Sequence, residues 1–129
     1  MMHRPSFRSP LGRAIGLGSA KTGSQHWLAQ RVTAVALVPL TLWFVASIIA
    51  HAGSDYPAFI AWLRMPLVAG GMILLLIALF HHMALGLRVV IEDYVHSGRR
   101  FAAIIAIQLS CYSLAVVGII ATLRIAFGR

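Results

Sequence analysis

The chain has 129 residues, of which 60% are hydrophobic and 11% are charged, and its formal net charge at pH 7 is +8. So much apolar surface cannot be buried in the one small core that a soluble chain of this length could form, so the composition predicts an integral membrane protein. The basic residues are scattered around the apolar segments without interleaved aromatic residues that could stack on bases, which argues against nucleic acid as a partner. The net charge instead predicts attraction to the headgroups of a lipid bilayer.

The first part of the chain, residues 1–29, is predicted to be a basic arm that precedes the first membrane span. It has no acidic residue, and its frequent glycines disfavour a long regular helix. We therefore expect an extended arm on the cytoplasmic side that lies on a partner protein.

Three apolar runs without Asp, Glu, Lys or Arg follow the arm. They cover residues 32–54, 65–87 and 101–123. About 20 apolar residues are enough for a helix to cross a bilayer, so we predict an all-α integral membrane protein with three transmembrane helices in a single domain, residues 1–129. The expected bounds of the helices are residues 30–51, 65–92 and 101–124, and a turn-rich outer loop is expected at residues 53–57.

The distribution of Lys and Arg predicts how the helices are oriented. One group of basic residues precedes the first span or lies between the second and the third. Its members are Arg4, Arg8, Arg13, Lys21, Arg31, Arg88, Arg99 and Arg100. The other side has Arg64, Arg124 and Arg129. The positive-inside rule then places the N-terminus in the cytoplasm and the C-terminus outside.

The second span contains the segment HMALGLRVVIEDY, which begins at His82. At about 100° per residue, His82, Gly86, Val89 and Asp93 share one stripe of a helix. A neutral imidazole inside a membrane must find a hydrogen bond or bind a metal. Two interpretations therefore remain for His82: a histidine hydrogen-bonded across a helix interface, or an axial ligand of a b-type haem. His81 points about 100° away and is expected at an interface.

The end of the same segment carries Asp93 and Tyr94. A phenol at the membrane edge can donate a hydrogen bond to a quinone carbonyl, and the neighbouring carboxylate can orient it or pass protons. The alternative is a tyrosine of the aromatic belt beside the acidic end of a helix. Glu92 is expected to be solvated.

Three basic side chains are expected at a similar depth on the cytoplasmic side, His26 and Arg31 before the first span and Arg88 late in the second. They are either ordinary positive-inside anchors or contacts to the propionates of a haem, for which arginine has the matching geometry. His51, at the other end of the first span, is expected to be a surface histidine. Cys111 is the only cysteine, so no disulfide within the chain and no zinc site are expected.

The spacing H-x3-G-x6-D-Y, the N-terminal run RSPLGRAIGLGSAKTGSQHW and the motif QRVTA together resemble the hydrophobic membrane anchor of succinate dehydrogenase in its alphaproteobacterial type. The resemblance covers residues 8–95. The histidine and arginine before the first helix are spaced one residue differently in the family than His26 and Arg31 are here, so His26 departs from the pattern.

The resemblance implies a subunit without catalytic activity of its own in succinate:quinone oxidoreductase, or complex II, an enzyme of electron transport and the tricarboxylic acid cycle in the bacterial inner membrane. The implied partners are the cytochrome b subunit, which is the larger membrane anchor, the iron-sulfur subunit and the flavoprotein subunit. It implies a haem b shared with the cytochrome b subunit, and ubiquinone as substrate. The implied site residues are His82 as haem ligand, Tyr94 and Asp93 at the quinone, and Arg31, His26 and Arg88 at the propionates.

Two other functions remain open at this point. One is a fumarate reductase anchor that works in the reverse direction. The other is a cofactor-free structural membrane protein or a small transporter, although no acidic residue lies within a predicted span to couple transport to an ion.

Overall fold

The computed structural model describes residues 21–96 and 98–128, and every regular element in these ranges is an α-helix. The helices are α2 (Lys21–His51), α3 (Tyr56–Leu63), α4 (Pro66–Tyr94) and α5 (Arg99–Phe127). The three longest are long and apolar enough to cross a membrane. The predicted all-α class with three candidate spans is therefore confirmed.

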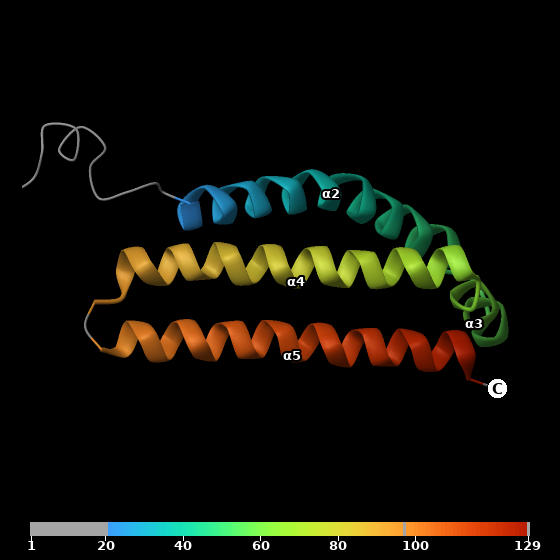
Figure 1. The fold of residues 1–129 in the computed structure, drawn as a ribbon. Helices are drawn as coiled ribbons and strands as arrows, with labels where there is room; N and C mark the ends of the chain where they lie inside the picture. Colours follow the sequence, from blue (N-terminus) through green and yellow to red (C-terminus); the bar gives the residue numbers. More distant parts are fainter. Residues whose placement is uncertain (1–20, 97, 129) are drawn as a thin grey trace, which may run out of the picture.

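The long helices lie side by side with α4 between α2 and α5, and α3 connects α2 to α4 at one end (Figure 1). The beginning of α2, the end of α4 and the beginning of α5 lie together at the opposite end. We call this the α4 C-terminal end. Because three long helices alternate in direction, α2 begins at one end of the bundle and α5 finishes at the other.

The first long helix begins earlier than expected, at Lys21 instead of near residue 30. Residues 21–29 are thus helical and are not part of an extended arm, while residues 1–20 of the expected arm lie outside the described residues. Gly23 costs about 1 kcal/mol of helix propensity relative to alanine, and residues 23–28 of this first part of α2 are exposed.

The short helix α3 replaces part of the expected outer loop. Asp55 caps it by accepting a hydrogen bond from the Ala58 N–H at 3.0 Å, and Pro57 occupies its first turn, both of which are start signals for a helix. His51 at the end of α2 stacks on Trp62 of α3, with ring centroids 4.4 Å apart. His51 was expected to be a surface histidine, and its ring is half-buried against this aromatic cluster.

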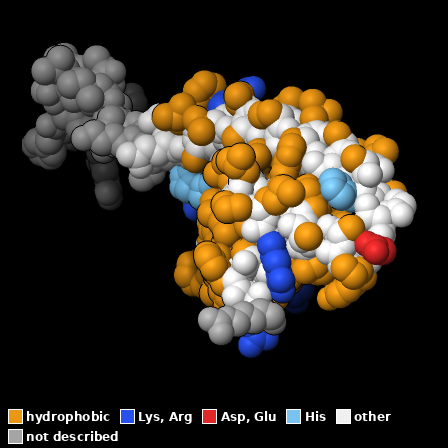
Figure 2. Space-filling model, turned by 90° about the vertical axis from the view of Figure 1, so that its right-hand side faces the viewer, with side chains coloured by type: hydrophobic (Ala, Val, Ile, Leu, Met, Phe, Trp, Pro, Cys, Tyr) orange, Lys and Arg blue, Asp and Glu red, His pale blue; other side chains and the backbone are white. Residues whose placement is uncertain are grey.

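Glycine allows close contact on both sides of α4. Trp43 of α2 lies over Gly71, where a Cβ atom would come within 2.9 Å of the indole ring, and Leu76 lies over Gly118 of α5, where a Cβ atom would come within 3.1 Å. Most large apolar side chains outside these contacts are exposed. Figure 2, viewed onto the end that carries α3, shows this mostly hydrophobic surface with isolated charged side chains. Such a surface suits lipid or an apolar partner.

Candidate functional site

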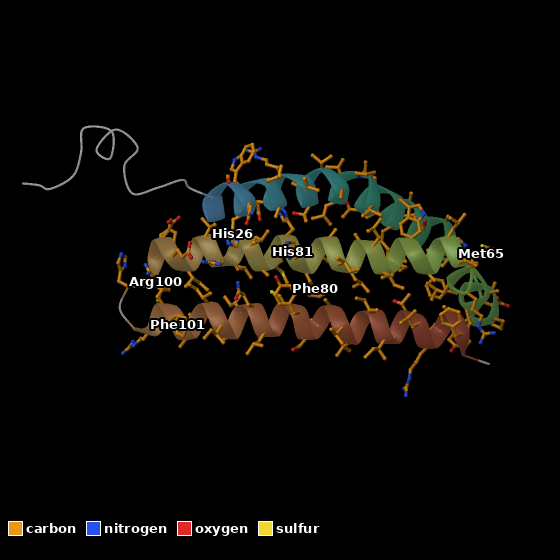
Figure 3. The ribbon with its side chains drawn as sticks, viewed as in Figure 1. His26, Met65, Phe80, His81, Arg100 and Phe101 are labelled. Carbon is orange, nitrogen blue, oxygen red and sulfur yellow. The ribbon has the colours of Figure 1, made fainter. Side chains whose placement is uncertain are left out.

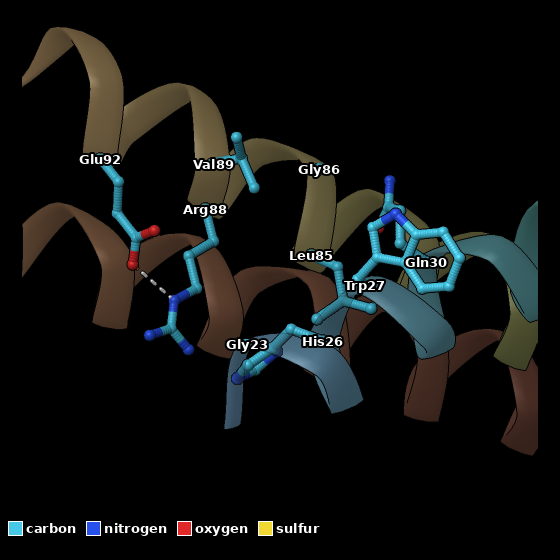
Figure 4. Close-up of a pocket in the computed structure, with 9 residues that line it drawn as sticks. All are labelled: Gly23, His26, Trp27, Gln30, Leu85, Gly86, Arg88, Val89 and Glu92. Carbon is cyan, nitrogen blue, oxygen red and sulfur yellow. Dashed lines mark hydrogen bonds and ion pairs between the residues drawn. The ribbon is translucent and has the colours of Figure 1, made fainter. Parts of the chain in front are cut away.

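A groove with a volume of about 700 Å³ separates α2 from α4 near the α4 C-terminal end. This volume lies in the range of ligand sites in proteins. The lining residues are Gly23, His26, Trp27, Gln30, Leu85, Gly86, Arg88, Val89 and Glu92, and Figure 4 shows them on the two helices. Gly86 and Val89 of the predicted stripe thus line the groove, whereas Asp93 is not among the lining residues.

His82 lies next to this groove and faces α2. Its Nδ1 atom lies 3.0 Å from Thr33 Oγ1, and its Nε2 atom lies 3.4 Å from Gln30 Nε2. The Thr33 hydroxyl also lies 2.7 Å from the carbonyl oxygen of Ala29, one turn earlier on α2. Both ring nitrogens of His82 therefore contact one face of α2.

Gln30 separates His82 from the space in the groove. Its amide nitrogen contacts the imidazole, while its Oε1 atom is buried without a hydrogen-bond partner among the described residues. An unsatisfied buried acceptor costs about 1–3 kcal/mol. Gly86 lies on the opposite wall, where an added Cβ atom would come within 3.4 Å of Gln30 Nε2. The Gln30 side chain is therefore closely surrounded and incompletely hydrogen-bonded.

The neighbouring histidine, His81, faces the other way. Its Nδ1 atom lies 3.2 Å from the Tyr112 hydroxyl of α5, and the two rings are 6.2 Å apart. Figure 3 labels His81 on α4, and His81 is not among the residues that line the groove. The expected interface position of His81 is confirmed, because the two adjacent histidines contact different helices.

The mouth of the groove carries charged side chains. Arg88 donates from Nε to Glu92 Oε1 at 2.8 Å, one turn later on α4, and His26 lines the groove from α2 (Figure 4). Glu92 was expected to be solvated, but it forms this ion pair although its side chain is still 40% exposed. An exposed pair of this kind adds little stability, so Arg88 can exchange Glu92 for another anion at low cost.

The other predicted site residues lie outside the groove lining. The Arg31 guanidinium lies 5.5 Å from the centre of the Trp27 ring, as in a cation–π contact. Asp93 and Tyr94 form the exposed last turn of α4, with Tyr94 81% exposed. A rise of 1.5 Å per residue puts Tyr94 roughly 18 Å along the helix from His82. The structure therefore brings together His26, Arg88 and the side chains next to His82, while Arg31, Asp93 and Tyr94 lie apart.

The sequence did not single out Gln30, Thr33 or Trp27 as functional. Gln30 and Thr33 are polar residues three positions apart near the start of an apolar run, so they share a helix face, and this spacing was the signal that could have found them. No group of three or more His, Cys, Asp or Glu side chains that could hold a metal ion occurs in the described part of the chain. A haem ligated by one histidine from each of two subunits would require only one such ligand here.

The chain matches the family described as succinate dehydrogenase/fumarate reductase transmembrane subunit over residues 5–121. A succinate dehydrogenase hydrophobic membrane anchor subunit of Rickettsia bellii is 39% identical over 80% of this chain and 83% of its own length. The subunit of the same name from Paracoccus denitrificans is 33% identical over 95% of each chain. That from Rickettsia conorii is 33% identical over 89% of this chain and 93% of its own. No solved structure shows a significant similarity.

Proposed function

Because this chain belongs to the family of succinate dehydrogenase and fumarate reductase transmembrane subunits, as a succinate dehydrogenase membrane anchor, we propose that it supplies one axial ligand of a haem b, His82, and part of the quinone-reduction site. The oxidation of succinate then takes place in a flavoprotein subunit, and electrons reach the membrane through an iron-sulfur subunit. The second axial ligand comes from the cytochrome b subunit. This chain is not catalytic by itself.

The observation that carries the haem proposal is the position of His82 beside a groove between two spanning helices. The groove has an aromatic and apolar wall from Trp27 and Leu85, and glycine at Gly86 where a planar ring could approach the backbone. Its mouth carries His26 and Arg88, which is paired with Glu92. The orphaned oxygen of Gln30 indicates a side chain that can leave its place beside His82. These features fit a flat, largely apolar ligand with carboxylates at one edge.

His82, His26 and Arg88 would hold such a haem from this chain. The bound group would supply a one-electron redox centre within the membrane. Arg88, now paired with Glu92, and His26 would neutralise carboxylates at the mouth of the groove. Arg31 would need to leave Trp27 in order to join them.

A cofactor-free anchor is the competing function, and one observation favours it. Both ring nitrogens of His82 already have neighbours on α2, as in a histidine that only joins two helices. The two functions differ in one requirement, because only the haem function needs the Nε2 lone pair of His82 to become accessible to iron.

The proposed quinone contacts are Tyr94 and Asp93, at the exposed end of α4. A quinone carbonyl there would accept a hydrogen bond from the Tyr94 hydroxyl, and Asp93 would pass protons from water. Their exposure in this single chain suits a site that is completed by the iron-sulfur subunit. Ubiquinone is the proposed substrate.

We further propose that the chain is a multi-pass protein of the bacterial inner membrane, with the α4 C-terminal end facing the cytoplasm. Arg88, Arg99 and Arg100 lie at that end, and Arg64 and Arg124 at the other, which agrees with the positive-inside rule. A reporter enzyme that works only outside the cytoplasm should be active when it is fused after Arg129. Activity of a cytoplasm-dependent reporter at this position would contradict the orientation and the proposed contact of Tyr94 with the iron-sulfur subunit.

Two adjacent variants test the haem proposal in the purified complex. His82→Leu should remove most of the haem, measured as the reduced-minus-oxidised absorbance per flavin. His81→Leu is the matched control, because it changes the neighbouring residue but breaks only a contact with Tyr112 of α5. If His82→Leu assembles and keeps as much haem as the parent complex, the ligand assignment is wrong. A parent complex with flavin but without haem would favour the cofactor-free anchor.

A further inference from the structure

We propose that Thr33 is a positioning residue that fixes the proton of His82 on Nδ1 and so directs the lone pair of Nε2 toward Gln30 and the groove. In this arrangement the Gln30 amide lies against Nε2 and would have to move aside for His82 to hold a haem through that atom. The inference rests on the proposed haem function, and it adds to it the way in which α2 prepares the ligand.

The geometry at Thr33 determines which partner donates. Thr33 Oγ1 lies 2.7 Å from the carbonyl oxygen of Ala29 and 3.0 Å from His82 Nδ1. A hydroxyl has one proton, and a carbonyl oxygen has none to donate. If the proton pointed to His82, two oxygens would face each other at 2.7 Å with no proton between them. The hydroxyl therefore donates to Ala29 and accepts from His82, so that Nδ1 carries the proton.

The contact with Gln30 agrees with the same protonation state. The amide nitrogen of Gln30 can only donate, so the His82 Nε2 atom that lies 3.4 Å away must accept. Exchange of the amide oxygen and nitrogen would place an acceptor opposite Nε2. Because the Thr33 contact already places a proton on Nδ1, the ring would then need protons on both nitrogens, and the resulting charge is costly within a membrane. Both neighbours of the ring are thus satisfied by one neutral tautomer.

This tautomer is the one that can bind a metal through Nε2. An imidazole coordinates through a nitrogen lone pair, and its other N–H commonly donates to a partner that fixes the ring and raises its basicity. Thr33 is placed to be that partner without any movement. Gln30 holds Nε2 only through a long contact, and its own oxygen is orphaned, so little is lost when its amide leaves.

The test compares Thr33→Val with Thr33→Ser in the purified complex. Valine keeps the shape but removes the acceptor, whereas serine retains it. Thr41→Val is the matched control, because Thr41 Oγ1 likewise donates to a carbonyl one turn earlier, at 2.6 Å from Leu37 O, on the same helix. It removes the same local bond without a histidine nearby.

We expect Thr33→Val to weaken haem binding about 10- to 100-fold, measured as transfer to excess apomyoglobin, as for other residues that orient a metal ligand. The haem midpoint potential should rise, because a less basic ligand stabilises the ferric state less. A tenfold loss of preference for the ferric state corresponds to about 59 mV for one electron. Thr33→Ser and Thr41→Val should have the haem affinity and the midpoint potential of the parent complex. Haem affinity that is unchanged in Thr33→Val, or that falls equally in Thr41→Val, would overturn the inference. The proposal that His82 binds haem would still stand.

A second measurement needs neither a variant at Thr33 nor bound haem. The complex is labelled with nitrogen-15 at histidine, reduced, and studied by NMR. The signal of His82 is the one that disappears in His82→Leu, and we expect it to show a protonated Nδ1. An Nε2–H tautomer for this signal would overturn the role of Thr33. If the parent has the expected tautomer but no haem, the proposed haem function fails and the placement of the proton by Thr33 stands.

Discussion

The two interfaces of α4 differ in kind. Toward α5 the helix presents Leu76 against Gly118, and Cys111 and Ala115 of α5 are buried. This interface is mainly apolar, and in the described part of the chain His81 contacts Tyr112 across it. Toward α2 only the half that contains Trp43 and Gly71 is closed. The other half contains the contacts of His82 with Gln30 and Thr33 and opens into the groove.

Under the proposed haem function, this difference assigns stability to one interface of α4 and ligand binding to the other. Packing without voids contributes most of the stability of a membrane bundle, whose helices gain nothing from leaving water. A polar, incompletely filled interface gives up part of that stability. The adjacent histidines follow the same division, since His81 joins α4 to α5 and His82 lies beside the space between α4 and α2.

The largest expected effect is a difference in haem content between two variants, each with a leucine in place of a glycine at one of the two interfaces. In Gly86→Leu the new side chain should enter the groove opposite Gln30, because an added Cβ atom already lies 3.4 Å from the Gln30 amide. We expect haem content to fall by about tenfold or more, because overpacking of about 1–3 kcal/mol would oppose a ring in the groove, while the complex still assembles. Haem absorbance per flavin measures the effect.

The matched variant Gly118→Leu inserts the same side chain against Leu76, where an added Cβ atom would lie 3.1 Å away. Overpacking should lower the free energy of unfolding by about 1–3 kcal/mol, while the complex that assembles keeps its haem. If both variants lost haem to the same extent at equal stability, the division between the two interfaces would not hold.

Tyr94→Phe separates the groove from the end of α4. The ring and its packing remain but the hydroxyl is deleted, so a quinone would lose one hydrogen bond, worth about 1–3 kcal/mol, or roughly 5- to 150-fold in quinone-dependent rate. Haem content should not change, because Tyr94 does not line the groove. Succinate oxidation with an artificial acceptor upstream of the membrane is the control. An unchanged rate at subsaturating quinone would reduce Tyr94 to an aromatic anchor.

The spans were predictable because lipid requires long apolar runs, and three such runs stand out in the sequence. The start of the first helix was not, since Lys21 lies within α2: a long basic side chain can reach the headgroups from there. The bounds of the other two long helices, Pro66–Tyr94 and Arg99–Phe127, lie within three residues of those expected. The helix α3 was missed although Asp55 and Pro57 marked its start, because eight residues are too few for a span.

The site was predictable only in part. Periodicity placed Gly86 and Val89 on the face of His82, and both line the groove. It could not show that Gln30 and Thr33 meet that face, because the rotation of α2 against α4 depends on packing such as Trp43 over Gly71. Arg31 follows Gln30 directly and points about 100° away from it, toward Trp27.

The smallest expected effect tests the closed half of the α2–α4 interface. Gly71→Ala places a methyl group 2.9 Å from the Trp43 ring, whereas Gly70→Ala, one residue earlier on α4, places it where nothing lies within 4 Å. Both changes give α4 the same gain of about 1 kcal/mol in helix propensity. The difference between them therefore isolates the displacement of Trp43, and Gly71→Ala should be less stable than Gly70→Ala by about 1 kcal/mol, toward the lower limit for overpacking because the ring can swing outward. Unfolding of the purified complex in a denaturing detergent measures this difference. Equal stability of the two variants would mean that Trp43 does not close this half of the interface, and the rotation of α2 that brings Thr33 to His82 would need another cause.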